Sequence, residues 1–512
     1  MDPFSIGDPS VNVAPLFLRL THWFNLLFLT LLVRSGLAIL AAHPKLYWNI
    51  HSKPGSEWLR FTRKKMPEDR MWCSTDEEES WSGLIALPGG ESLGLGRYWH
   101  FLNALCWLIC GAFYAALLFL SPQWQRLIPT SWQVIPDAIR DMAMYLTFRT
   151  PPRGTPYGPS PFNPLQQVTY FGVIFGLAPM MILTGLAQSP SIAGRFPWYE
   201  RLFGHRQAAR SLHFLGLVAF LGFLVIHLVM VFWHGFAREM NVMVLGSENV
   251  GTYWWAGAAI GVGIITAIIL VHVAANLVSA HHRRATHHAL SAVVAPIREG
   301  VLHHLNSVQH YPESWMSAYF RTNGYPPISA YPQAKGDDDT YERLMNGGFA
   351  DYRLRVDGLV DHPMELSLEE LRKLPRQEQT TLHHCIQGWT SIGRWGGVRV
   401  AEVLERCGVR PEARYLAFYS FGKHEKTGKP YYECVTLDLA NHPQALLAYE
   451  LNGEPLPVQH GAPLRLRLET KLGFKMVKYL HAIEVIDDYG KVGGGQGGVR
   501  EDEQQFDMGA EI

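Results

Sequence analysis

The chain has 512 residues, which is long enough for two or three domains, so averages over the whole sequence describe no part of it well. Its 45 basic and 45 acidic side chains cancel, and we expect no nucleic acid partner, because neutralising phosphates needs an excess of Lys and Arg. The six cysteines have no paired CxxC spacing, which argues against a disulfide scaffold and a zinc ribbon.

The N-terminal segment shows none of the marks of an export signal. It has no basic region before its first apolar stretch, no cleavage site of small residues and no twin arginine. We therefore expect the first apolar run to be retained as a helix.

Five apolar runs in the first half approach the ~20 residues that a membrane-spanning helix needs. They cover residues 16–42, 98–120, 165–187, 211–233 and 254–278. A segment of about 55 residues, rich in Trp, Gly and charge, separates the first two runs. The sequence thus predicts an all-α transmembrane bundle of about five spans, with the lipid bilayer as its partner.

Four histidines occupy informative positions in these spans. His22 lies about two turns into the first span, His100 opens the second, and the fourth carries both His213 and His227. Ionisable side chains inside a membrane usually face the bundle interior and serve a function. The 14 residues from His213 to His227 return to nearly the same helix face, at a rise of ~21 Å. Each could give one axial imidazole to a haem, one near each membrane surface.

Chain direction selects the partners of these two histidines. Because the first, second and fourth spans alternate in direction, His22 and His227 fall at one depth, and His100 and His213 fall at the other. The alternative is that a membrane histidine only hydrogen-bonds a neighbouring helix, and we predict this for His272, which has no matched partner. We expect the paired histidines after the fifth span to be solvated: His281 and His282, His287 and His288, and His303 and His304.

The segments around these histidines resemble the four-helix di-haem cytochrome b family. The resemblance rests on RLTHWFNLLFLTLLVRSGLAIL, AAHPKLYW, RYWHFLNAL, NPLQQVTYFGVIFGLAPMMILTGLA and RSLHFLGLVAFLGFLVIHLVMV, together about 230 residues. The similar proteins are the b subunits of formate dehydrogenase, nickel-iron hydrogenase and, most closely, thiosulfate reductase. The resemblance implies two b haems and electron exchange with membrane quinone, whereas the fifth span and the appended domain depart from the family pattern.

From about Phe349 the pattern changes to short β-type runs separated by turn residues and short helices, which predicts a soluble α+β domain. Cys385 stands in TLHHCIQGWTSIGRWGGV, where a thiolate could bind a soft metal. Basic residues near Gly-containing turns are good phosphate binders. Four such residues cluster downstream: His460, Arg465, Lys475 and Lys478. The alternative is a buried structural thiol and a solvated strand edge.

Residues 349–487 resemble the sulfite oxidase-type molybdopterin domain through CIQGW, WGGV, LAYELNG, HGAPLRLRL and GFKMVKYL, which fall in the family's order. The resemblance implies that Cys385 is the protein ligand to molybdenum and that the four basic residues hold the pterin and its phosphate. It also implies a molybdopterin-dependent oxidoreductase.

The residues after Cys385 depart from true sulfite oxidases, which have an Ala-Gly-Asn-Arg-Arg run where this chain has IQGWT. The pattern is closer to the bacterial branch that includes the sulfoxide-reducing catalytic subunit paired with a haem membrane partner. We expect a small oxyanion or an S- or N-oxide as the small-molecule substrate, with Arg394, the nearest remaining cation, as its anchor.

The expected organisation has four parts: a di-haem bundle over residues 1–280, a juxtamembrane helix and linker over 281–348, the molybdopterin domain over 349–490, and a flexible Gly-rich acidic tail over 491–512. We expect electrons to move between molybdenum and quinone through the His100/His213 haem and then the His22/His227 haem. The alternative function is an electron-transfer subunit with a cofactor-less docking domain. The direction of flow stays open, as does the choice between a homodimer and an additional redox subunit.

Positive charge in short loops sets membrane topology. Six basic residues flank the N-terminal side of the spans and 15 flank the other side. The count favours a cytoplasmic soluble domain at the bacterial inner membrane, whereas the usual orientation of the cytochrome family, with five spans, would put that domain in the periplasm.

Overall fold

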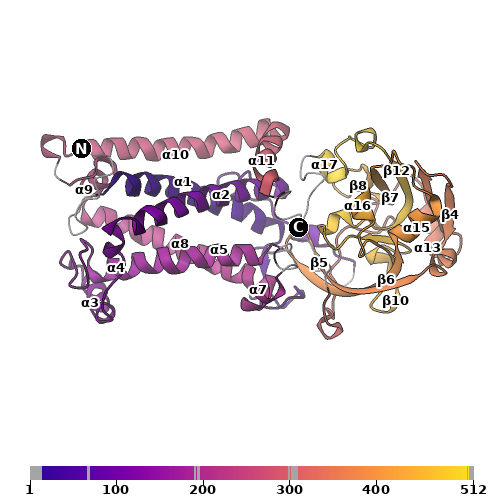
Figure 1. The fold of residues 1–512 in the computed structure, drawn as a ribbon, viewed down its shortest axis with the longest axis horizontal. Helices are drawn as coiled ribbons and strands as arrows, with labels where there is room; N and C mark the ends of the chain where they lie inside the picture. The colour runs from indigo at the N-terminus through magenta and orange to yellow at the C-terminus, as the bar shows by residue number, and fades with distance from the viewer. Residues whose placement is uncertain are drawn as a thin grey trace. The chain divides into compact units, whose positions relative to one another are not determined.

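The computed structural model describes residues 14–65, 70–189, 192, 196–248, 250–297, 300, 310–503 and 506. It divides into two compact units (Figure 1), which we call the helical unit and the sheet unit. The helical unit comprises Met1–Gly36, Trp99–Leu186 and Leu212–His281. The sheet unit comprises Leu37–Tyr98, Ala187–Ser211 and His282–Ile512. The predicted domain limits stay predictions.

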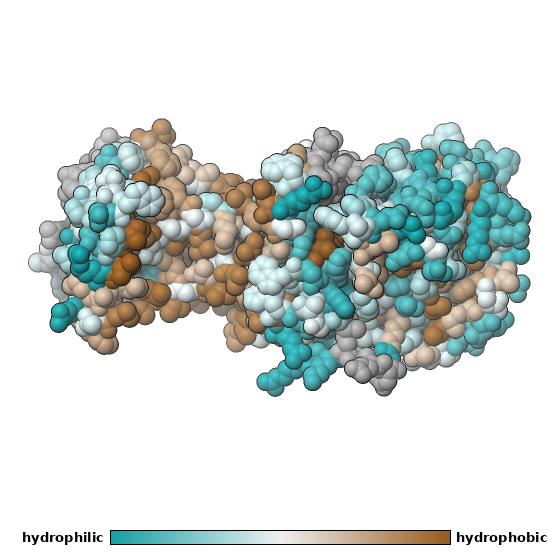
Figure 2. All heavy atoms as spheres, turned by 90° about the horizontal axis from the view of Figure 1, so that it is seen from below, coloured by the Kyte–Doolittle hydropathy of each residue, from teal (hydrophilic) through white to brown (hydrophobic). Residues whose placement is uncertain are grey.

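Five helices are long and apolar enough to cross a membrane, within the described part of the chain, as the sequence predicts. They are α1 (Leu16–Ala42), α2 (Leu93–Phe119), the composite helix Pro164–Ala187, α8 (Arg206–His234) and the stretch Gly251–His281 that contains α10 (Ala256–His281). Figure 2 shows apolar side chains exposed over these helices, as a lipid-facing surface requires. The protein is therefore a multi-pass membrane protein.

The third span is not one regular helix. It consists of α4 (Pro164–Phe171), a π-helical segment (Gly172–Leu177) and α5 (Ala178–Ala187). Shorter helices of the helical unit are α3 (Val134–Leu146) and α9 (Phe236–Met240). Both α2 and α8 begin five residues before the predicted spans: α8 opens on the polar residues Arg206 and Gln207, and α2 opens on Leu93–Gly96 followed by Arg97.

Two five-stranded sheets form the centre of the sheet unit. One has the order β10-β9-β6-β5, with β11 also paired to β9, and the other has the order β4-β3-β12-β7-β8. Only β3 and β12 pair in parallel among these strands. The strands are β3 (Arg353–Gly358), β4 (Met364–Ser367), β5 (Arg376–His384), β6 (Thr390–Arg399), β7 (Tyr415–Lys423), β8 (Pro430–Thr436), β9 (Leu446–Leu451), β10 (Glu454–Pro455), β11 (Arg465–Arg467) and β12 (Leu480–Ile486).

Short helices complete the sheet unit and confirm the predicted α+β class. They are α7 (Pro197–Leu202), α11 (Arg283–Ile297), α13 (Thr340–Asn346), α14 (Leu368–Arg372), α15 (Val400–Cys407), α16 (Leu437–Ala440) and α17 (Val499–Asp502). The main apolar core joins both sheets and α15: Val398 and Leu447 come from one sheet, Phe418 and Ile483 from the other. Burial of such side chains is the main favourable term in folding.

The long segment after α1 folds into the sheet unit. It contains a short hairpin of β1 (Lys45–Leu46) and β2 (Leu59–Arg60). The fully buried Glu77 carboxylate forms ion pairs with Lys45 at 3.0 Å and with Arg321 at 3.2 Å. Because a buried charge is costly unless it is paired, these contacts fix the segment against residues near 321.

The start of the predicted flexible tail is also folded. The Asp502 carboxylate accepts hydrogen bonds from the Tyr432 hydroxyl at 2.6 Å and from the backbone N–H groups of Gly494 at 2.8 Å and Gln496 at 3.1 Å. Residues 491–503 thus make defined contacts, and most of the later residues lie outside the described ones; the flexible tail stays a prediction.

Candidate functional site

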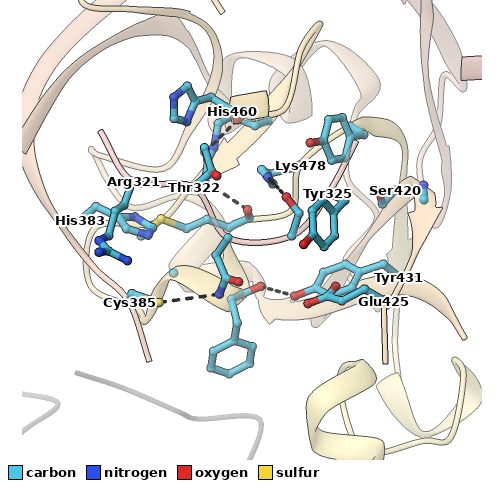
Figure 3. A pocket seen from close by; sticks show the side chains of 18 of the residues that line it. Arg321, Thr322, Tyr325, His383, Cys385, Ser420, Glu425, Tyr431, His460 and Lys478 are labelled. Atoms are coloured by element: carbon cyan, nitrogen blue, oxygen red, sulfur yellow. Dashed lines mark hydrogen bonds between the residues drawn. The ribbon is translucent and has the colours of Figure 1, made fainter. Parts of the chain in front are cut away.

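Cys385 follows the last residue of β5 and stands at the start of a tight turn. The Gly388 N–H donates to the Cys385 carbonyl at 3.0 Å, and the Cys385 N–H donates to the Trp389 carbonyl at 3.2 Å. Gly388 has φ +105°, a conformation that favours glycine. The turn places the Cys385 side chain, only 3% exposed, in the wall of a cavity (Figure 3).

The cavity is rich in positive charge. Five cationic side chains line it, against the single carboxylate of Glu425 among the described lining residues. The five are Arg321, Lys423, Arg465, Lys478 and Arg500. Arg321 already pairs with Glu77, and the excess of positive charge among the other lining residues favours an anionic ligand.

Three of the four basic residues predicted to hold the cofactor lie here with Cys385: His460, Arg465 and Lys478. The Arg465 guanidinium stacks over Trp395 at 4.9 Å and donates to the His460 carbonyl at 2.9 Å. Its Nε has no hydrogen-bond partner among the described residues. Burial, with help from Arg467, lowers the pKa of Arg465 to about 9. A buried donor without a partner is energetically unfavourable, which indicates that the Arg465 Nε–H bonds a ligand when one is present.

Lys478 and His460 titrate at unusual pH for the same reason. Burial lowers the pKa of Lys478 to about 7, and its Nζ donates to the carbonyls of Gly324 at 3.0 Å and Gln459 at 2.9 Å. Burial, followed by the charges of Lys478 and Arg465, lowers the pKa of His460 to about 3. His460 is therefore neutral near pH 7, while Lys478 is close to half protonated.

Two predicted site residues are not brought to the cavity. Lys475 is buried between the carboxylates of Glu433, at 2.8 Å, and Glu501, so its charge is already neutralised. Arg394 pairs with Glu313 at 3.2 Å near the surface. Neighbouring residues of a strand point to opposite faces, and in β6 it is Trp395 that faces Arg465. The structure gives no support to the roles predicted for Lys475 and Arg394.

The sequence interpretation missed several lining residues. Asn323 belongs to a segment that we read as linker, yet its Nδ2 lies 3.7 Å from the Cys385 Sγ, the dashed contact in Figure 3. Its Oδ1 is buried and has no partner among the described residues. Arg500 comes from the segment read as tail, where it is the only basic residue after Lys491, a signal that could have been used.

These features fit the molybdopterin group that the resemblance implies. Burial raises the pKa of the Cys385 thiol to about 12, so the free side chain is neutral, and binding a soft metal would release its proton. The unpartnered Arg465 Nε and Asn323 Oδ1 supply polar atoms for a ligand, and the lining cations supply charge for a phosphate.

In the helical unit the four predicted histidines form the two predicted pairs. The ring centres of His22 and His227 are 6.2 Å apart, and those of His100 and His213 are 6.4 Å apart. A metal–imidazole nitrogen bond of about 2 Å, plus about 1 Å from that nitrogen to the ring centre on each side, gives roughly 6 Å. Each pair therefore has the separation that one metal between two imidazoles requires.

The surroundings of one pair leave the ligating nitrogens free. The Nδ1 of His100 is hydrogen-bonded to the Ser35 hydroxyl at 3.2 Å, and the Nδ1 of His213 to the Thr184 hydroxyl at 3.0 Å. Such bonds orient a metal-binding imidazole and leave its Nε2 for the metal. The residues present fit a haem.

His272 behaves as predicted for a structural histidine. Its Nε2 contacts the Thr30 hydroxyl at 2.9 Å, and its Nδ1 contacts an Arg34 guanidinium nitrogen at 2.8 Å. The ring thus joins α10 to α1. Of the histidines after the fifth span, His281, His282 and His288 are exposed as predicted. The prediction is wrong for His287, which is 3% exposed and packs edge-on against Tyr98 at 4.9 Å. His303 and His304 lie outside the described residues.

Two family models match the chain. Residues 344–491 match the oxidoreductase molybdopterin binding domain, and residues 13–246 match the prokaryotic cytochrome b561 model. The two matches fall in the order that the sequence predicts.

Curated relatives match parts of the chain. An uncharacterized oxidoreductase, YuiH, from Bacillus subtilis is 37% identical over 150 residues, which cover 29% of this chain and 70% of that protein. The catalytic subunit of protein-methionine-sulfoxide reductase, MsrP, from Xanthomonas campestris is 36% identical over 145 residues, 27% of this chain and 45% of that protein.

A third relative is the putative protein-methionine-sulfoxide reductase subunit YedZ1 from Azospira oryzae, 36% identical over 179 residues, which cover 35% of this chain and 61% of that protein. The chain thus spans less than two thirds of both sulfoxide reductase subunits. Among solved structures, the sulfane dehydrogenase SoxCD from Paracoccus pantotrophus matches with a TM-score of 0.25 and 24% identity, over 30% of this chain and 40% of that one.

Proposed function

Because the chain belongs to the molybdopterin-binding oxidoreductases and carries a b561-type cytochrome bundle in the same polypeptide, we propose that it is a membrane-bound reductase of S-oxides, driven by quinol. Electrons pass through two b haems to a molybdenum cofactor. The family membership and the matched cytochrome bundle make it an oxidoreductase with haem b and molybdenum cofactors. What we propose in addition is the substrate, the number of haems and the quinone.

One observation carries the proposal: a buried thiol opens into a cationic cavity, on a chain that also holds two histidine pairs at metal-spanning distance. The molybdenum cofactor, when bound, supplies oxygen-atom transfer coupled to two electrons. Cys385 is the protein ligand in this proposal, and Arg465, His460 and Lys478 hold the anionic part of the cofactor. None of these roles falls to Arg394 or Lys475.

The relatives favour an S-oxide as substrate, since two of them are named for protein methionine sulfoxide. The cavity suits this substrate. A sulfoxide is uncharged and has one strongly polar oxygen, and the Asn323 amide beside Cys385 is a neutral donor for that oxygen. The aromatic rings of Tyr325, Tyr431 and Phe474 line the cavity and can contact the apolar and sulfur parts of such a molecule.

The stoichiometry of sulfoxide reduction sets the number of electrons and protons that the protein must supply. Reduction of one sulfoxide consumes two electrons and two protons and yields one thioether and one water. The electrons come from oxidation of one quinol to quinone.

We place the protein in the bacterial inner membrane with the sheet unit on the cytoplasmic side, on the strength of 15 basic residues against six in the flanking loops. The periplasmic side is the alternative. A reporter enzyme fused after Ile512 distinguishes the two, because alkaline phosphatase is active only in the periplasm.

The substrate is tested by reoxidation of the reduced haems in the purified protein. Methionine sulfoxide should oxidise the haems within seconds, trimethylamine N-oxide more slowly, and sulfate not at all. The Cys385→Ala variant should stay reduced with every substrate, whereas Cys407→Ala, which alters another buried thiol, should behave like the wild type. Haems that stay reduced with all sulfoxides would remove the proposed substrate class.

A further inference from the structure

The turn that carries Cys385 is bonded to the first turn of α8. The Gly388 carbonyl accepts hydrogen bonds from the Gln207 Nε2 at 2.8 Å and from the Arg206 Nη1 at 3.0 Å. The same Gln207 amide donates to the Thr390 hydroxyl at 3.2 Å. All four residues belong to the sheet unit.

The helix start itself is held firmly in the sheet unit. The Arg206 N–H donates to the Glu200 carboxylate at 2.9 Å. One turn later, the Arg210 guanidinium donates to the carbonyls of His43 at 2.6 Å and Lys45 at 2.7 Å, and its Nε lies 3.7 Å from the Cβ position of Gly388. The bonds to the Gly388 carbonyl are therefore part of a fixed arrangement.

Gln207 is an unusual residue for this place. Its side chain is fully buried, and its Oε1 has no hydrogen-bond partner among the described residues. An unsatisfied buried amide oxygen is unfavourable, and an apolar side chain of the same size would avoid that cost. The buried amide of Gln207 is thus held by its donor end alone, which bonds Gly388 and Thr390.

The chain connects this contact to both redox sites. Gly388 is joined to Cys385 by the 3.0 Å hydrogen bond that closes the turn. Gln207 stands six residues before His213 in the continuous helix α8. Between the Cys385 carbonyl and the backbone of α8 the connection contains two hydrogen bonds and otherwise covalent bonds.

We propose that the hydrogen bonds from Gln207 and Arg206 to the Gly388 carbonyl form the electron-transfer connection between the Cys385 turn and the helix that carries His213, with Gln207 as its positioning residue. The proposal rests on the proposed function. Each electron gained at the Cys385 side is one electron lost at the His213 side, so two electrons must cross for each S-oxide reduced. No bond of Gln207 or Arg206 forms or breaks.

The test measures electron movement without substrate. In the purified full chain with its cofactors, a flash-excited flavin reduces the haems, and two signals follow the electron: the haem absorbance and the electron paramagnetic resonance of molybdenum(V). Gln207→Met removes the donor and keeps the size of the side chain. We expect it to slow the transfer at least fivefold, with haem spectrum, midpoint potentials and molybdenum content unchanged.

Two further variants make the result specific. Arg206→Lys keeps one donor near Gly388 and should slow the transfer less than Arg206→Met. Gln167→Met is the matched control, because Gln167 is also fully buried but donates to the Arg126 carbonyl, at 3.4 Å, rather than to Gly388. It should leave the transfer unchanged.

Separate outcomes decide the inference and the function. If Gln207→Met transfers electrons at the wild-type rate, or if both Gln207→Met and Gln207→Glu fail to retain haem or molybdenum, the contact is structural and the inference is overturned. If the wild type itself moves no electron from haem to molybdenum, the proposed function fails instead. A small dye that reduces molybdenum directly should drive sulfoxide reduction equally well in the wild type and Gln207→Met.

Discussion

The helical unit and the sheet unit build their sites in different ways. The histidine pairs of the helical unit come from three helices whose residues meet because a helix repeats every ~3.6 residues and successive spans reverse direction. The cavity of the sheet unit combines strand residues, such as Arg465 of β11, with turns and segments outside the sheets at residues 320–325, 385–389 and 473–479. A site on membrane spans can be predicted from the spacing of its residues in the sequence, whereas a site built largely from turns requires the complete fold.

The largest effect expected from this comparison is the loss of a haem. His100→Ala and His213→Ala should each remove the same component of the visible spectrum, because their ring centres are 6.4 Å apart and would share one iron. His22→Ala and His227→Ala should both remove the other component. His272→Ala, a histidine bonded to Thr30 and Arg34, should remove neither. Redox-difference spectra of the variants measure these losses. If the two variants of one pair lose different components, the two histidines do not share one haem.

The second expected effect is a loss of stability in the sheet unit. Lys475→Met leaves the buried carboxylates of Glu433 and Glu501 without their cation, which costs about 3–5 kcal/mol. Burial and the mutual repulsion of the two carboxylates already raise the pKa of Glu433. Protonation of Glu433 and Glu501 removes their uncompensated charge in the variant. The loss of stability should therefore shrink as the pH falls and grow as the pH rises.

Thermal unfolding of the Lys475→Met variant between pH 5 and 8 measures that trend, with haem absorbance as the control for the helical unit. Lys491→Met is the matched surface control, since Lys491 pairs with Asp487 in solvent and should leave the unfolding temperature almost unchanged. Equal losses for the two variants would contradict the buried ion pair as a support of the fold.

A third, smaller effect concerns retention of the cofactor. Lys478 has a pKa of about 7 in the cofactor-free cavity, so its charge is present below that pH and is lost above it. Affinity for an anionic cofactor should therefore fall as the pH rises from 6 to 9. Lys478→Met should weaken retention about tenfold at pH 6, as expected for loss of a charged hydrogen bond, and should flatten the pH dependence.

The molybdenum content that remains after dialysis at each pH reports this effect. Lys426→Met serves as the control, because Lys426 pairs with Glu78 and Glu91 and is not among the residues that line the cavity. Retention in Lys478→Met that still falls with pH like the wild type would assign the titration to another group.

The smallest expected effect is that of Arg394→Ala. Arg394 pairs with Glu313, whose side chain is 63% exposed, and it does not line the cavity. Such a pair contributes about 0–1 kcal/mol. We expect wild-type KM and kcat for the sulfoxide and little change in unfolding temperature. A large rise in KM would restore the substrate-anchoring role that the sequence first suggested.

Much of the fold was predictable because it depends on local patterns. The five spans follow from continuous apolar runs, and the histidine pairs follow from the spacing of His213 and His227 together with span direction. Cys385 was predictable from its resemblance to a known motif. The short β-type runs predicted the α+β class, but they did not predict the order of the strands in the sheets.

The missed residues depend on contacts that sequence distance hides. Asn323 reaches Cys385 from 62 residues away, in a Pro-rich stretch that looks like linker. Arg500 lies in a Gly-rich acidic stretch that looks disordered, yet Asp502 fixes it by bonds to Tyr432. The surroundings of Lys475 could not be predicted, because a sequence shows a charge but not the two carboxylates that neutralise it.

The most direct test of the account is the metal content of the purified protein, with the molybdenum(V) resonance of its Cys385→Ala variant. The account predicts one molybdenum and two haem irons per chain in the wild type, and an altered molybdenum(V) resonance with both haem irons retained in the variant. A wild type that binds haem but no molybdenum in a cofactor-producing host, or an unchanged resonance in Cys385→Ala, would contradict it.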